Sequence, residues 1–280
     1  MKKIFSCALF SVVMLTAWGA AKPQMQVDTV KINSVNNIVS PMKVTVALPE
    51  TYLAKGDTAH YPVVYLLHGY SDDYSYYPKR MPLDSVASAY NMIIVCPDGR
   101  DSWYWDSPVN PDFQMESFFT QELVPTIDSL YRTRKSPEQR AIVGLSMGGH
   151  GALWLAMRHS DIWKNAGSMS GGVDITKREF HDQWRMKERL GEFKDNSVRW
   201  GEHTVAALVP GLQPGQLNII FCCGTEDFFF DVNNELSKSL NDHRIGHTYF
   251  TATGDHSWPY WNKVIYPILD NFKSHFDSGK

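Results

Sequence analysis

The chain has 280 residues, of which 43% are hydrophobic and 20% are charged, and its formal net charge is -3. These proportions are typical of a globular protein and exclude a disordered chain. The lysines and arginines are scattered rather than gathered into a basic stripe, so we expect no nucleic-acid partner.

The first 21 residues have the pattern of a cleaved secretory signal. Lys2 and Lys3 precede an apolar run at residues 4–18, and small residues occupy positions 19–21. A retained membrane anchor is the alternative, but the run is near the short end for a membrane span. We therefore predict a signal peptide at 1–21 and one domain at 22–280. The mature protein is expected to be periplasmic or secreted, without stable membrane insertion.

Short apolar runs then alternate with helix-like segments. An edge hairpin is expected at residues 27–35 and 42–48. Six further runs predict strands, at residues 63–67, 92–96, 141–145, 166–169, 217–223 and 247–251. The helices expected between them cover residues 83–90, 117–130, 147–158, 232–243 and 261–275. This alternation predicts an α/β fold with a mostly parallel central sheet flanked by helices.

One segment, residues 176–214, departs from this rhythm. It is polar and rich in charge and tryptophan, and it contains no strand-like run. We interpret it as a small helical insertion after a strand. It would either cap the functional site or form a plain surface excursion, and the sequence leaves both open.

The predicted mature chain keeps three cysteines, Cys96, Cys222 and Cys223. An odd number cannot pair completely, and each lies in an apolar strand-like run. We expect three buried free thiols that behave as small hydrophobic side chains. The sequence contains no Cys-x-x-Cys pair or Cys/His spacing typical of a zinc site, so no metal is expected.

The strongest chemical motif is G-x-S-x-G at residues 144–148, centred on Ser146. An apolar strand precedes it and a helix follows, which is the context the motif requires. Gly144 and Gly148 would let strand and helix approach closely around a sharp turn that exposes the serine hydroxyl. The free N–H groups at the start of the helix favour a developing oxyanion. The motif therefore predicts a nucleophilic serine.

A nucleophilic serine needs a base, and the base needs an acid to orient it. The motif's usual chain order places the acid and then the histidine after the serine. Asp227 and His256 each follow a predicted strand end, where sites on such sheets gather. Glu226 is the rival acid, while Asp255 is a poor candidate because neighbouring side chains point apart. We predict that Ser146, Asp227 and His256 are catalytic.

Two backbone N–H groups should stabilise the oxyanion. One is expected from Met147, directly after the serine, and the other from Tyr70, in the loop after an earlier strand. His68 is expected to support this loop. Aromatic residues cluster beside the same loops, and Trp103 and Trp258 are the candidates for substrate contact, with core packing as the alternative.

Taken together, six blocks resemble the esterase D group of α/β-hydrolases. The blocks are VVYLLHGYSDD, IIVCPDGRDSWYWDSP, FFTQELVPTID, AIVGLSMGGHGAL, CCGTED and GDHSW, and they span residues 43–271. The group includes feruloyl and acetyl xylan esterases of carbohydrate esterase family one, tributyrin esterases, S-formylglutathione hydrolases and mycobacterial mycolyltransferases. The resemblance implies the α/β-hydrolase fold, the same three catalytic residues and the same oxyanion donors.

These observations favour a secreted serine carboxylic-ester hydrolase that works through an acyl-enzyme. The resemblance and the signal together favour feruloyl or acetyl esters of plant polysaccharide, or simple short-chain esters. Acyl transfer to a sugar or lipid alcohol would use the same residues, and a non-catalytic carbohydrate-binding protein is a third hypothesis. No organic cofactor is implied, and the oligomeric state does not follow from the sequence.

Overall fold

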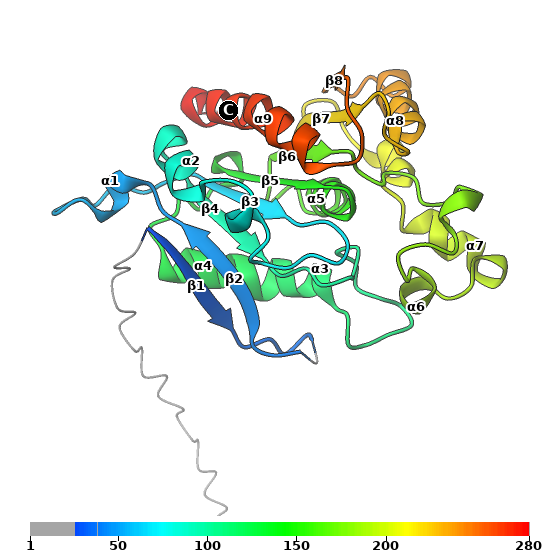
Figure 1. The fold of residues 1–280 in the computed structure, drawn as a ribbon, viewed down its shortest axis with the longest axis horizontal. Coiled ribbons are helices and arrows are strands. Elements are labelled where there is room, and N and C mark those ends of the chain that lie inside the picture. Colours follow the sequence, from blue (N-terminus) through cyan, green and yellow to red (C-terminus); the bar gives the residue numbers. More distant parts are fainter. Residues whose placement is uncertain (1–25, 38, 280) are drawn as a thin grey trace, which may run out of the picture.

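The computed structural model describes residues 26–37 and 39–279, which form one eight-stranded sheet between layers of helices (Figure 1). The predicted signal peptide at 1–21 lies outside the described residues. The strands are β1 (Val27–Ile32), β2 (Met42–Ala47), β3 (Val63–Leu67), β4 (Ile93–Pro97), β5 (Arg140–Leu145), β6 (Asn165–Met169), β7 (Asn218–Gly224) and β8 (Thr248–Ala252).

The strand order is β1-β2-β4-β3-β5-β6-β7-β8. β1 pairs with β2 and β2 with β4 in antiparallel fashion, and every later pair is parallel. The prediction of a mostly parallel sheet with an edge hairpin is therefore confirmed. Parallel pairing brings the carboxyl ends of β3, β5, β6 and β7 to one edge, so the loops that follow them meet there.

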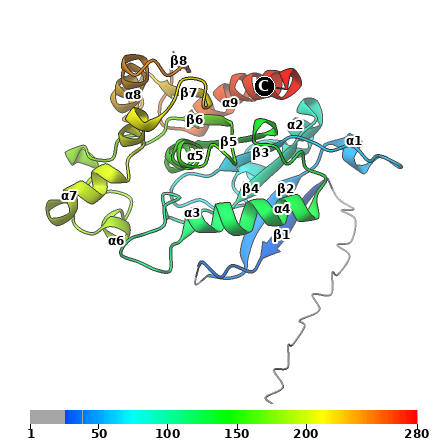
Figure 2. The same cartoon turned by 180° about the vertical axis from the view of Figure 1, so that it is seen from behind.

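Helices cover both faces of the sheet (Figure 2). They are α1 (Glu50–Leu53), α2 (Leu83–Tyr90), α3 (Met115–Ser117), α4 (Val124–Leu130), α5 (Met147–Arg158), α6 (Lys187–Leu190), α7 (Phe193–Glu202), α8 (Phe230–Asp242) and α9 (Trp258–Ser278). Alternate residues of β3 belong to opposite cores: Tyr65 belongs to the core that includes residues of α4, α5 and α8, whereas Leu66 belongs to the one that includes residues of α2 and α9. Two separate apolar cores thus hold the sheet in place.

The helix expected at residues 117–130 is present, but it is not uniform. It begins as α3, continues as a π-helical segment at Phe118–Leu123 and ends as α4. Pro125, in the first turn of α4, lacks an N–H and would clash with the carbonyl four residues earlier. The wider π turn before it accommodates this restriction.

The insertion at residues 176–214 is helical, as predicted, and joins β6 to β7. It consists of a short 3₁₀ turn at Arg178–Phe180, the helices α6 and α7, and a second 3₁₀ segment at Val205–Gly211. Both views show α6 and α7 projecting to one side of the sheet, away from β1 and α1.

The three cysteines are free and buried, as expected. Cys96 lies in β4, and Cys222 and Cys223 lie in β7. Burial raises the pKa of the Cys222 thiol to about 12 and raises the pKa of the other two as well. In the part of the chain that is described, no helix is long and apolar enough to cross a membrane.

The turn between β5 and α5 depends on two glycines. A Cβ atom on Gly144 would lie 2.3 Å from the carbonyl oxygen of Gly148 and 2.7 Å from that of Leu67. One on Gly148 would lie 2.2 Å from the Leu67 oxygen. These neighbours are backbone atoms of α5 and of the end of β3, which side-chain repacking cannot move.

Gly148→Ala is therefore expected to lower the free energy of unfolding by about 3 kcal/mol, because the added methyl group overlaps backbone. Gly201→Ala is the matched control, since Gly201 lies in α7 with open space around its Cβ position. Removing this helical glycine should stabilise the protein by up to about 1 kcal/mol. Urea unfolding of both variants measures the difference, and equal midpoints would contradict the packing argument.

Candidate active site

Ser146 lies at the turn between β5 and α5, with backbone angles φ 55° and ψ -119°. This conformation is strained for a residue with a side chain and costs about 1–3 kcal/mol. Its N–H donates to the carbonyl oxygen of Met169 at 2.9 Å, and its own carbonyl accepts the N–H of His150 at 3.1 Å. The turn is held by these contacts, and the half-buried hydroxyl is presented at the carboxyl edge of the sheet.

The structure brings the three predicted catalytic residues together, although 110 positions separate the serine from the histidine. His256 Nε2 lies 2.8 Å from Ser146 Oγ, and His256 Nδ1 lies 3.0 and 2.9 Å from the two carboxylate oxygens of Asp227. A carboxylate only accepts hydrogen bonds, so Nδ1 carries the proton and Nε2 is free to accept from the serine hydroxyl. This is the arrangement that a general base requires.

The Asp227 side chain is fully buried. A buried carboxylate is costly unless its oxygens are hydrogen-bonded. Besides the imidazole, it accepts the N–H of Phe229 at 2.8 Å. Of the rival acids, Glu226 is exposed and Asp255 accepts a hydrogen bond from Ser257. Asp227 is the acid that contacts the histidine.

The loop after β3 lies against the serine turn. A Cβ on Gly69 would lie 2.8 Å from Leu145 Cδ1 and 3.6 Å from Ser146 Cβ, so a glycine here lets the loop pack closely against the end of β5 and the serine. The N–H of Met147 starts α5 and has no acceptor within the helix. Tyr70, the other predicted donor, follows Gly69 directly. Met147 is thus bonded directly to the serine, and Tyr70 lies in a loop that approaches it; their role as oxyanion donors stays a prediction.

His68 fixes this loop, as its expected supporting role requires. It is 1% exposed, its Nδ1–H donates to the Gly69 carbonyl at 2.7 Å, and its Nε2 accepts the N–H of Gly99 at 2.8 Å. The Tyr104 hydroxyl donates to the His68 carbonyl at 3.0 Å. The loops after β3 and β4 are therefore tied together at the edge where the serine lies.

The two tryptophans predicted to contact substrate lie in different surroundings. Trp103 is 1% exposed and stacks on Trp105 at 5.7 Å, with the edge of His150 against it. Burial lowers the pKa of His150 to about 3, so its neutral ring accepts the Trp105 indole N–H at 2.9 Å. Trp103 is thus part of a packed aromatic layer, and substrate contact by it stays a prediction.

Trp258 is partly exposed at the start of α9. Its ring centroid lies 5.5 Å from that of Tyr76 and 5.7 Å from that of Trp261. Trp261 in turn lies edge-on to His256 at 5.0 Å. Trp258 is therefore one ring removed from the imidazole, and its contact with substrate also stays a prediction.

Sequence reasoning missed an aromatic wall formed by Phe228 and Trp184. Phe228 is 54% exposed, and its ring lies 4.3 Å from the His256 ring. Trp184, from the insertion, stacks on Phe228 at 5.9 Å with an interplanar angle of 22°. The run of three phenylalanines after Asp227 was a signal for this wall. Nothing in the local sequence indicated that Trp184 would reach it.

The arrangement brings together a serine hydroxyl, an imidazole nitrogen that can accept its proton, a buried carboxylate and the backbone N–H at the start of α5. These are the groups needed for acyl transfer from an ester to the serine oxygen and then to water. Within residues 26–37 and 39–279, no group of three or more His, Cys, Asp or Glu side chains is placed to hold a metal ion.

Comparison with known proteins agrees with this chemistry. A family model described as "Putative esterase" matches residues 35–272. An acetyl esterase from Caldicellulosiruptor saccharolyticus is 28% identical over 221 residues, which cover 75% of this chain and 82% of the relative. The S-formylglutathione hydrolase of Bos taurus is 25% identical over 209 residues, covering 67% and 71%.

Among solved structures, a ferulic acid esterase aligns with a TM-score of 0.73 and 26% identity. The alignment covers 89% of this chain and 98% of that one. The region that the family model matches includes β2 to β8, the serine turn and the histidine loop. The chain therefore belongs to this esterase family, has the α/β-hydrolase fold and is a serine ester hydrolase.

Proposed function

We propose that Ser146, His256 and Asp227 form the catalytic triad and that the enzyme cleaves carboxylic esters through an acyl-enzyme. The observation that carries this proposal is the continuous pair of hydrogen bonds from the serine hydroxyl through the imidazole to the buried carboxylate. A structural role alone does not require a strained serine turn aimed at a histidine.

In the first half-reaction, Ser146 Oγ attacks the ester carbonyl carbon while His256 Nε2 takes the hydroxyl proton. The N–H groups of Met147 and Tyr70 stabilise the negative oxygen of the tetrahedral intermediate. The carbon–oxygen bond to the alcohol then breaks, and the leaving alkoxide takes the proton from Nε2. Water attacks the acyl-serine by the reverse sequence and releases the acid. Asp227 holds the imidazole in the required tautomer and stabilises its cation.

We further propose acetyl or aromatic acyl groups, such as feruloyl, as the acids released. The names of the related acetyl esterase and ferulic acid esterase support this class. The aromatic wall supports it as well, because Phe228 exposes its ring beside the histidine and an apolar acyl group would bury that surface. Plant polysaccharide and simple short-chain alcohols are the proposed alcohol partners.

The N-terminal pattern of Lys2, Lys3, the apolar run and the small residues supports export with cleavage after about residue 21. Water rather than an alcohol is the proposed acceptor, since the relatives compared above are named esterases or hydrolases. Product analysis with excess sugar alcohol separates the two acceptors, because transfer would yield a new ester in place of free acid.

Replacement of the nucleophile tests the triad directly. Ser146→Ala should reduce turnover of p-nitrophenyl acetate by about 10⁴-fold or more, because no other group can form the acyl-enzyme. Ser129→Ala is the matched control, since Ser129 is an exposed serine of α4. Initial rates of both purified variants provide the measurement, and activity in Ser146→Ala close to that of the control would refute the proposal.

The identity of the acid is tested by a pair of adjacent substitutions. Asp227→Asn should lower kcat by about 10³- to 10⁴-fold, because an amide N–H in place of the carboxylate favours the wrong imidazole tautomer. Glu226→Gln should change kcat by less than about threefold, since Glu226 is exposed. If the larger loss followed the Glu226 change, the assignment of the acid would be wrong.

Trp184→Ala tests the aromatic wall. Loss of one stacked ring should reduce kcat/KM for methyl ferulate by about tenfold, and reduce it less for p-nitrophenyl acetate, whose acyl group is too small to span the wall. Val198→Ala, at an exposed position of the same insertion, is the control. Equal losses for both esters in Trp184→Ala would argue that the wall does not contact the acyl group.

A further inference from the structure

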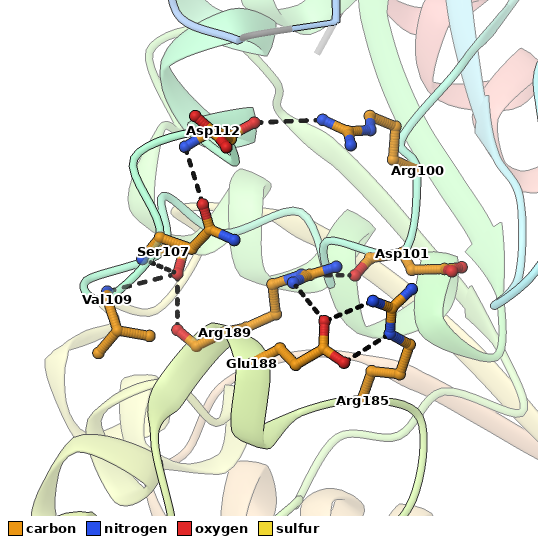
Figure 3. A network of polar contacts seen from close by, with 9 residues as sticks. Arg100, Asp101, Ser107, Val109, Asp112, Arg185, Glu188 and Arg189 are labelled. Carbon is orange, nitrogen blue, oxygen red and sulfur yellow. Dashed lines mark hydrogen bonds and ion pairs between the residues drawn. The ribbon is translucent and has the colours of Figure 1, made fainter.

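Three arginines from two distant segments meet beside the loop that carries Tyr70 (Figure 3). Arg100 follows β4, whereas Arg185 and Arg189 come from the insertion. They contribute to a cavity of about 290 Å³, which we call the arginine pocket. Its lining residues are Ser71, Asp72, Asp73, Asp98, Arg100, Asp101, Phe113, Arg185 and Arg189.

Arg189 is built into this pocket rather than attached to its surface. Its side chain is 2% exposed, its Nε donates to the Asp101 carbonyl at 3.0 Å, and Nη1 lies 3.4 Å from a carboxylate oxygen of Glu188. Its guanidinium lies over the Phe113 ring at 3.5 Å. Burial of a guanidinium cation costs free energy unless it is paired and hydrogen-bonded, so its burial at this place points to a functional role for the charge.

Arg100 lies over the same ring, at 3.9 Å from its centroid. Its side chain donates to the Asp112 carbonyl at 3.2 Å, so among the described residues its hydrogen bond goes to a neutral oxygen rather than to a carboxylate. Two guanidinium groups thus lie over the single phenyl ring of Phe113. Burial lowers the pKa of both arginines, and the neighbouring positive charges add to this effect on Arg189.

The third arginine stands at the open side of the pocket. The Arg185 side chain is 56% exposed and forms a two-pronged ion pair with Glu188, at 2.8 and 2.6 Å. Glu188 also reaches Arg189, so one carboxylate is shared between two guanidinium groups. Figure 3 shows both arginines converging on it.

Most of the aspartates that line the pocket already accept backbone hydrogen bonds. Asp101 accepts the N–H of Ser71 at 2.8 Å, Asp98 accepts that of Arg100 at 2.9 Å, and Asp73 accepts that of Ser75 at 2.7 Å. These carboxylates therefore shape the loops as well as balancing charge. Each guanidinium offers five N–H groups, and the hydrogen bonds described above use only some of them.

We propose that the arginine pocket binds the carboxylate of an acidic ester substrate, such as one that carries a uronic acid. This inference rests on the proposed function, because the pocket-lining Ser71 directly follows Tyr70, the proposed oxyanion donor, and Gly69 of the same loop lies against Ser146. Guanidinium groups match a carboxylate in geometry and form paired, charge-assisted hydrogen bonds with it. The four lining aspartates repel any anion, and they repel a doubly charged phosphate more strongly than a singly charged carboxylate.

Binding is the first test. Calorimetric titration of the wild-type protein at constant ionic strength should show glucuronate binding at least tenfold more tightly than glucose. Arg185→Gln and Arg100→Gln should each weaken glucuronate binding by about tenfold, while Arg178→Gln, an exposed arginine of the same insertion, should not. Equal affinity for glucose and glucuronate would overturn the proposal, as would tighter binding of glucose 6-phosphate than of glucuronate.

Turnover is the second test. We expect a higher kcat/KM for an acetylated glucuronoxylan oligosaccharide than for the same oligosaccharide with its uronate reduced to glucose. Arg185→Gln should reduce the ratio of the two kcat/KM values, uronate over reduced substrate, about tenfold. Because Arg185 is exposed, we expect this variant to fold even if Arg100→Gln does not. If Arg185→Gln left this ratio unchanged while Ser146→Ala still lost turnover of both substrates, the carboxylate-binding proposal would be wrong and the triad proposal would stand. If Ser146→Ala kept its activity, the triad proposal would fail, but the calorimetric binding of glucuronate would be unaffected.

Discussion

The backbone of Leu67 lies against Gly144 and Gly148 so closely that neither glycine has space for a Cβ atom. This contact sets the distance between the end of β3 and the turn after β5. The serine hydroxyl and the loop that carries Tyr70 are consequently neighbours before any substrate arrives. Electrostatic stabilisation of an oxyanion depends on such fixed placement, because donors that must first move lose much of their effect.

Much of the fold follows from local patterns. The near-continuous apolar runs located β3 to β7 to within a few residues, because strands buried on both faces tolerate little else. The edge strands β1 and β8 were also located, although most of their residues are partly exposed. The spacing G-x-S-x-G located the strained turn, because glycines are required on both sides of it. The candidate partners Asp227 and His256 followed from their positions after strand ends, and the structure places them in contact.

The aromatic surroundings could not be derived in the same way. Trp103 sits in a packed layer with Trp105 and His150, which depends on contacts between separate loops. Trp184 and Arg185 are adjacent, and both have positive φ angles, 51° and 53°. Left-handed backbone at two bulky residues runs against local preference, so tertiary contacts impose it. This bend turns the tryptophan toward Phe228 while the arginine stays beside the arginine pocket, and one insertion thereby serves both surfaces.

The reactivity of the buried thiols in β4 and β7 can be used to measure unfolding of the core. A thiol-specific reagent reacts with the thiolate, and here each thiol is both buried in a core between the sheet and its helices and held in its protonated form. Reaction therefore requires that the helices separate from the sheet. The speed at which native enzyme takes up such a reagent therefore follows large-scale unfolding of the core rather than motion of the surface loops, and no label has to be engineered to observe it.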